Sequence, residues 1–188
     1  MPRRRGDVVI AVGLDPSLTC TGVAIANGSE ITTRRVMSPN LGKSLLSRRN
    51  RIRRAVEGIL APIPARVDVT VIEVPHSRQQ FGAQNERIAL YWILVDQLLA
   101  RGPVVEVAPS QRAKLATGNG RATKDDVVAV TRAAFPEAQI PDDNVGDAVA
   151  LMWAGARWAG AETPTYLPGQ EEAFSRLAWP IRSTTPTH

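Results

Sequence analysis

Three short apolar runs near the start of the chain constrain its fold more than any other feature. Residues 8–14 are rich in Val and Ile and predict a buried central strand. Two further runs, 21–26 and 31–37, flank Asn27-Gly28, a dipeptide typical of a two-residue β-hairpin turn. The chain therefore predicts a three-stranded antiparallel start.

Helices and short strands alternate after this hairpin. Apolar spacing predicts helices at 45–60 and 85–100, and short apolar runs predict strands at 67–73 and 104–107. Further helices are expected at 110–117, with Ser110 as N-cap, at 124–135 and at 146–159. This order predicts an α/β domain with a mixed sheet. The helix at 85–100 has one apolar stripe, Ile88, Trp92, Val95 and Leu99, and also carries Tyr91; from the residues alone, this stripe belongs to the core more often than to an interface.

Length and composition point to one domain with an anionic partner. With 188 residues, we expect one domain over 1–160 and a Pro/Thr-rich tail over 161–188, partly disordered or docked through Phe174, Leu177 and Trp179. The net charge of +5 favours nucleic acid or an anionic membrane as partner. A single cysteine, the absence of an 18-residue apolar stretch and the lack of a secretory signal predict a cytoplasmic protein.

Three acids stand at positions where a sheet edge would gather them. Asp15 and Glu73 each end an apolar run, and Asp147 lies at the start of the last predicted helix. If the two strands are neighbours, both carboxylates emerge at the same edge, where α/β folds bind ligands. Each acid alone also has an ordinary explanation, as turn chemistry before a proline or as a charge favoured at a helix start.

Together, these acids predict a metal centre. Carboxylates that are forced together repel one another unless a cation joins them, and oxygen ligands without a His/Cys cluster select Mg²⁺ or Mn²⁺. Two such ions can activate water and stabilise the leaving oxygen in phosphodiester hydrolysis. Asp143 and Asn144 lie four and three residues before Asp147, so either can share its helix face.

The motifs, in this order, resemble the RuvC-type Holliday junction resolvases. The segments "VGLDPSLTCTGVAI", "VIEVPHS" and "DNVGDAVALMWA" are similar to that family's first strand and hairpin, second acidic strand and last acidic helix. The segment "VAPSQRAKLATGNGRATKDDV" is similar to its DNA-binding segment, and "TGNGRATK" is the most specific stretch. The resemblance covers residues 8–158 and leaves open a bacterial or a phage origin, with the host cytoplasm as the location in the second case.

The resemblance implies a ribonuclease H-like fold with a mixed five-stranded sheet flanked by helices. It also implies a homodimer that cleaves four-way DNA junctions by paired nicks, with two Mg²⁺ or Mn²⁺ ions per active site. For the helix at 85–100, it favours one face on the sheet and the other on the partner subunit. By position, Asp15, Glu73 and Asp147 match metal ligands, and Lys124 matches a catalytic basic residue. Lys114 matches the basic residue before the glycine turn, and Phe81 matches an aromatic residue of the junction-contacting loop.

Asn144 departs from the family pattern, which has an acid or a histidine at that position. An amide keeps the shape of a carboxylate but loses its charge, so it binds a cation far less well. Three explanations stay open: Asp143 substitutes as a ligand, the site works with three acids, or Asn144 is an inactivating replacement for Asp.

Basic residues supply candidate DNA contacts. The "GNGR" turn needs glycines for positive φ or close backbone approach, and it brings charge beside exposed amides; a plain helix-linking turn explains it equally well. The charged face of the helix at 45–60 has two explanations: it contacts the phosphates of a DNA arm, or it is an ordinary solvent-exposed face. The candidate DNA-binding residues are Lys114, Arg121, Lys124, Arg78, Phe81, Arg48 and Arg49.

Three other functions compete with junction resolution. One is a broader nuclease for forks and flaps, and another is a catalytically silent junction-binding protein, which Asn144 favours. The third is an actin-like ATPase or sugar kinase, but these folds need a second lobe and an adenosine-binding glycine cluster that 188 residues do not supply.

Overall fold

A five-stranded mixed sheet forms the centre of the molecule. The computed structural model describes residues 8–75 and 83–181. The strands are β1 (Ile10–Asp15), β2 (Cys20–Asn27), β3 (Glu30–Met37), β4 (Val69–Glu73) and β5 (Val104–Val107), in the order β3-β2-β1-β4-β5. The first three pair antiparallel, whereas β4 and β5 add in parallel beside β1. The predicted antiparallel start and mixed sheet are confirmed.

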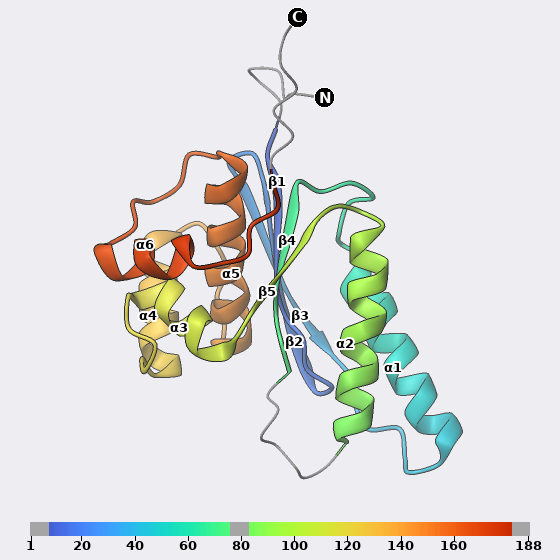
Figure 1. Cartoon of the computed structure of the whole chain (residues 1–188). Coiled ribbons are helices and arrows are strands. Elements are labelled where there is room, and N and C mark those ends of the chain that lie inside the picture. Colours follow the sequence, from blue (N-terminus) through green and yellow to red (C-terminus); the bar gives the residue numbers. More distant parts are fainter. Residues whose placement is uncertain (1–7, 76–82, 182–188) are drawn as a thin grey trace, which may run out of the picture.

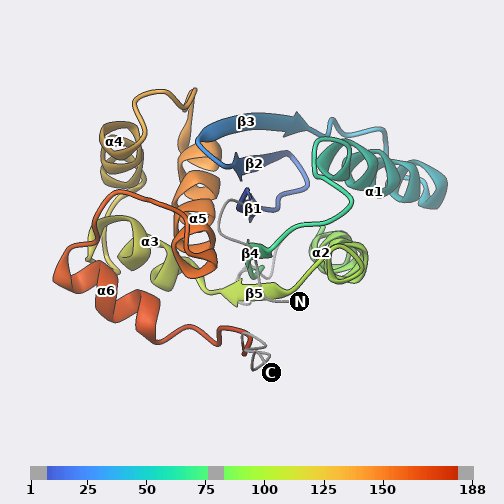
Figure 2. The ribbon, with the colours of Figure 1, turned by 90° about the horizontal axis from the view of Figure 1, so that it is seen from above.

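Helices cover both faces of this sheet (Figures 1 and 2). On one face lie α1 (Leu45–Leu60) and α2 (Gln84–Leu99). On the other face, α5 (Asp143–Ala159) lies directly on the strands, and α3 (Pro109–Thr117), α4 (Lys124–Ala134) and α6 (Pro168–Ser175) pack outside it. Each face buries its own apolar core. The sheet therefore separates two hydrophobic layers, as expected for a three-layer α/β domain.

The hairpin turn forms as the sequence predicts. Gly28 adopts a left-handed φ of 64°, and β2 and β3 pair from Cys20 with Met37 to Asn27 with Glu30. A residue with a Cβ is strained at this φ, which explains the glycine after Asn27.

The buried face of α2 differs from the expected one. Leu90, Leu94 and Leu98 are buried against the sheet, whereas Trp92 is 60% exposed and Leu99 58% exposed. Ile88 is also exposed, so only Val95 of the predicted stripe is buried. The prediction that this stripe packs in the core is wrong because α2 is apolar on two sides, and helical spacing alone cannot tell which side meets the strands.

Helices α2, α3 and α5 begin earlier than predicted, α2 by one residue. Helix α3 starts at Pro109 with Ala108 as N-cap, because proline is favoured in the first helical turn and the Gln111 side chain accepts a hydrogen bond from the Ala108 N–H. The prediction of Ser110 as the N-cap is therefore wrong. Helix α5 starts at Asp143, where the Asp142 carboxylate accepts from the Val145 N–H and caps the helix.

The segment after residue 160 packs on the domain as far as it is described. The buried Gln170 side chain of α6 donates to the carbonyls of Leu115 and Ala116 in α3. The Trp179 ring stacks on Trp158, with centroids 5.7 Å apart. Within the described residues, no helix is both long and apolar enough to cross a membrane.

Candidate metal centre at the carboxyl ends of β1 and β4

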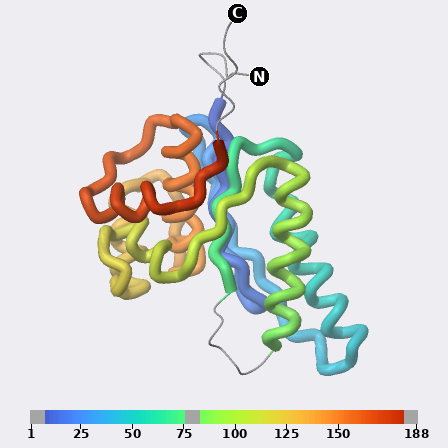
Figure 3. Tube along the Cα trace, viewed as in Figure 1, coloured from blue at the N-terminus to red at the C-terminus, as the bar shows by residue number. Residues whose placement is uncertain are grey.

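Asp15, Glu73 and Asp147 line one pocket. Because β1 and β4 are parallel neighbours, their carboxyl ends lie at the same edge, which is the lower end of the sheet in Figure 3. Asp15 is the last residue of β1 and Glu73 the last residue of β4. Asp147, near the start of α5, faces the same pocket, whose volume is about 360 Å³. The structure thus brings together the three acids that the sequence singles out.

Gly22, which has no side chain, lets α5 approach this edge of the sheet. Gly22 of β2 pairs with Asp15 across the sheet. A Cβ on Gly22 would lie 1.9 Å from the carbonyl oxygen of Asn144, well inside van der Waals contact. The first turn of α5 therefore rests on the strand beside Asp15, and Asp147 follows three residues after Asn144.

Arg112 connects two of the acids. Its side chain comes from α3 and is buried, with Nε donating to Oε2 of Glu73 at 2.8 Å and Nη1 donating to Oδ1 of Asp147 at 2.5 Å. Sequence reasoning missed this residue. An arginine three positions after Pro109, at the start of a helix that follows a strand end, was the only signal available.

Burial dominates the electrostatics of the acids. Removal from water, reinforced by the charge of Glu73 and opposed by Arg112, raises the pKa of Asp15 to about 7. Removal from water also raises the pKa of Asp147 to about 8, although the Arg112 guanidinium partly opposes this shift. Burial therefore keeps Asp15 and Asp147 protonated to a higher pH than carboxyl groups in water.

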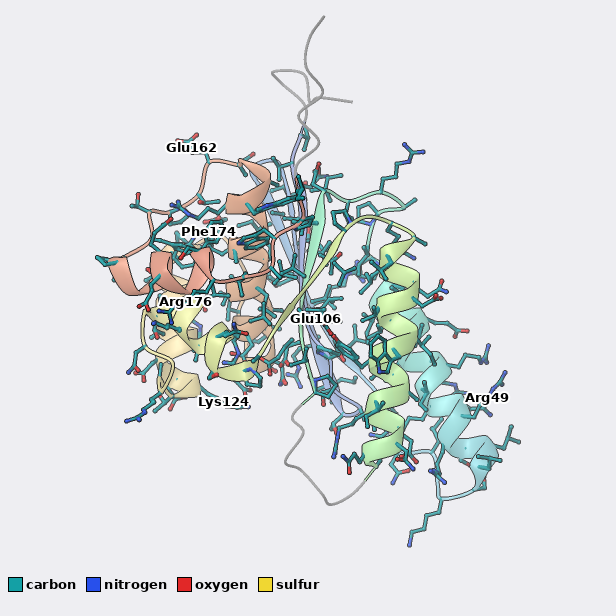
Figure 4. All side chains as sticks on the ribbon, viewed as in Figure 1. Arg49, Glu106, Lys124, Glu162, Phe174 and Arg176 are labelled. Atoms are coloured by element: carbon teal, nitrogen blue, oxygen red, sulfur yellow. The ribbon has the colours of Figure 1, made fainter. Side chains whose placement is uncertain are left out.

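Lys124 lines the other side of the pocket. It is the first residue of α4, and its ammonium group pairs with the Asp143 carboxylate. This hydrogen bond raises the pKa of Lys124 and lowers that of Asp143. Lys124 lies at the lower end of the sheet in Figure 4, on the α5 side. It stays largely exposed, so its charge is available to a ligand that enters from solvent.

The donor set suits a hard divalent cation, but Arg112 lies between two of the donors. Carboxylate oxygens, such as those of Asp15, Glu73 and Asp147, are the ligands that Mg²⁺ and Mn²⁺ prefer. Over residues 8–75 and 83–181, however, no three His, Cys, Asp or Glu side chains are arranged to hold one ion together. The Arg112 guanidinium bonds to both Glu73 and Asp147, so the donors fit a cation by their chemistry, and a basic side chain of the protein already pairs with two of them.

Other predicted site residues lie outside this pocket. The Asn144 amide lies 3.5 Å from the Asp143 carboxylate, and neither residue lines the pocket. Lys114 points to α6, where it pairs with Glu172 at 2.7 Å. Arg121 is exposed in the turn before α4, where the Asn119 side chain accepts from its N–H.

The basic helix α1 lies on the opposite side of the sheet. Arg48 pairs with Glu86 of α2, and the Arg49 side chain donates to Asn50. Figure 4 shows Arg49 on the outer side of α1, far from Lys124. Arg78 and Phe81 fall outside the described residues.

Comparison with known proteins supports the fold. No family model matches the chain, and no curated protein matches its sequence. A solved structure of RuvC from Thermus thermophilus is similar with a TM-score of 0.57 and 20% identity, over 84% of this chain and 100% of that chain. A T. thermophilus RuvC in complex with Holliday junction substrate matches with a TM-score of 0.58 and 18% identity, over 84% of this chain and 99% of that chain. These likenesses confirm the predicted ribonuclease H-like fold.

Proposed function

We propose that this chain is a structure-selective endonuclease that resolves four-way DNA junctions by paired, metal-dependent hydrolysis of phosphodiester bonds. The observation that carries the proposal is the convergence of Asp15, Glu73 and Asp147 in one polar pocket at the carboxyl ends of β1 and β4. The sequence resemblance and the fold shared with T. thermophilus RuvC support a place in the RuvC-like family.

Each pocket residue has a role in this proposal. Asp15, Glu73 and Asp147 would hold Mg²⁺ or Mn²⁺, two ions per site, and Asp143 or Asn144 would complete the ligand set from the first turn of α5. When bound, these ions activate a water molecule and stabilise the leaving oxygen. Lys124 offsets the charge that develops on the phosphate.

DNA would enter from the side of the pocket where Lys124 is exposed. Lys124 and Arg121 both lie near the start of α4, and the N–H groups of that helix start add partial positive charge. Contacts of this kind position the phosphate backbone without reading its sequence. Arg48 and Arg49, on the far side of the sheet, would contact a separate arm of a branched substrate, and Lys114 would support the turn through α6.

A homodimer supplies the two active sites that paired nicks require. Helix α2 exposes four apolar side chains, and exposed apolar patches often mark protein–protein interfaces. A second copy that covered this surface would remove it from water. The exposed side chains are Ile88, Trp92, Ile93 and Leu99.

Cleavage of labelled DNA tests the proposal. The purified chain is incubated with Mg²⁺ and a four-way junction, a fork or a linear duplex, and the nicks are mapped on each strand. Symmetric nicks in the junction and no cleavage of the duplex are expected. Equal cleavage of the fork would instead show a broader branched-DNA nuclease. Tight junction binding without nicks would show a silent binding protein, as Asn144 would produce.

A further inference from the structure

Arg112 is buried where a shared cation would neutralise two acids. The residue is 8% exposed, and its guanidinium bonds to carboxylates that come from two different elements, β4 and α5. Long basic side chains are seldom buried to this degree unless they are paired. Glu73 and Asp147 are therefore held by a cation that belongs to the protein itself.

Glu73 and Asp147 cannot bind both Arg112 and a divalent ion strongly at the same time. A guanidinium that stayed between Glu73 and Asp147 would face a second positive charge at short range, in a pocket where burial weakens screening. If Arg112 left without a replacement, two buried carboxylates would stand unpaired beside Asp15, which is also unfavourable. One cation therefore has to replace the other.

We propose that Arg112 is an internal counterion that holds the Glu73–Asp147 pair in the metal-free protein and competes there with the divalent cation. This inference rests on the proposed function, because it takes the pocket as the metal centre. Arg112 then lowers the metal affinity of the folded chain and keeps the acids in place before metal arrives. It is a positioning residue, and metal binding requires its side chain to release at least one carboxylate.

Mn²⁺ binding to Arg112→Gln tests the competition directly. Calorimetric titration of the metal-free protein with Mn²⁺ is expected to show about tenfold tighter binding by Arg112→Gln than by the unmodified chain, within the usual range of coupling between two ligands. In EDTA, Arg112→Gln is expected to unfold at a lower temperature, and saturating Mn²⁺ is expected to raise its melting temperature more than that of the unmodified chain.

Two further variants make the test specific. Arg157→Gln removes the same charge and another arginine–carboxylate pair, with Glu171, from the far part of α5, and it should leave Mn²⁺ affinity unchanged. Arg112→Lys keeps a charge but cannot bridge both acids in the same way. Its Mn²⁺ affinity should therefore lie between those of the unmodified chain and Arg112→Gln. If Arg112→Gln does not fold without metal, Arg112→Lys carries the comparison.

The inference would be overturned if the Arg112 variants bound Mn²⁺ no more tightly than the unmodified chain. It would also be overturned if none of these chains bound Mn²⁺. The titration uses no DNA. Tighter Mn²⁺ binding by Arg112→Gln together with a failure to nick junctions would therefore sustain the inference and reject the proposed nuclease.

Discussion

Gly13 of β1 touches the backbone of Ala148 in α5. A Cβ on Gly13 would lie 2.0 Å from the Ala148 carbonyl oxygen. Asp15 follows Gly13 by two residues, and Asp147 is the neighbour of Ala148. This backbone contact therefore sets the separation between two acids of the candidate metal centre.

Gly13→Ala should destabilise the protein severely. The helix has to move away from β1 to admit the methyl group, at a cost of about 3 kcal/mol or more, in the range of overpacked cores and disrupted backbone contacts. Urea denaturation measures the loss. Gly58→Ala is the control, because the nearest atom to its Cβ is a methyl carbon of Val36 rather than backbone. A Gly13→Ala protein as stable as the control would contradict the close packing of α5.

The metal-free protein should lose stability as the pH rises. The folded-state pKa values of Asp15 and Asp147, about 7 and about 8, lie above the ordinary value of 3.8. Protonated carboxyls therefore favour the folded state, and this contribution is complete below about pH 4 and lost as the pH rises through 7 and 8. Thermal melts in EDTA between pH 5 and 9 measure it.

The doubly substituted chain, Asp15→Asn with Asp147→Asn, is the control for the pH effect. Its amides do not titrate, so its stability should fall less between pH 5 and 9, while the remaining carboxylates titrate alike in both chains. The same pH dependence in both would show that these acids titrate as they do in water.

Lys124 and Lys114 should have different effects on cleavage. Lys124 lines the pocket, whereas Lys114 pairs with Glu172 at the contact between α3 and α6. Lys124→Ala should reduce junction nicking by about 10²-fold, as loss of a charge-stabilising group does. Lys114→Ala should reduce it by less than about threefold, because an exposed ion pair contributes little. Single-turnover nicking rates distinguish them, and equal losses would refute this assignment.

Asn144→Asp should increase metal-dependent cleavage. Asn144 lies on the same face of α5 as Asp147, three residues earlier, and a carboxylate there would add charge to the ligand set. The Mg²⁺ dependence of nicking measures the change, with Asn40→Asp in the loop before α1 as the control. Equal nicking by the Asn144→Asp and unmodified chains would defeat the idea that the amide weakens the site.

The order of elements and the three acids were predictable because they depend on local patterns. Short Val/Ile runs, the Asn27-Gly28 turn and helical spacing each reflect one element, and acids at the ends of parallel neighbours meet by topology alone. The segment 104–107 was predicted with the bounds that β5 has.

The buried side of α2 and the place of Arg112 in the pocket could not be predicted, because they depend on how each helix is rotated against the sheet. Helix α2 has apolar residues on two sides, so its pattern could not say that Leu94 faces inward and Trp92 outward. Arg112 and Lys114 are two residues apart on α3, yet one enters the pocket and the other meets α6. A sequence pattern predicts that both are charged, and only packing decides which one is buried.

Mg²⁺-dependent nicking of an end-labelled four-way junction by the unmodified chain and by Asp15→Asn tests the central claim most directly. The account predicts paired nicks by the unmodified chain and a loss of more than about 10²-fold in Asp15→Asn, since even changes around metal ligands cost up to about that much. Junction binding should persist in both. Undiminished nicking by Asp15→Asn would contradict the assignment of this pocket as the metal centre.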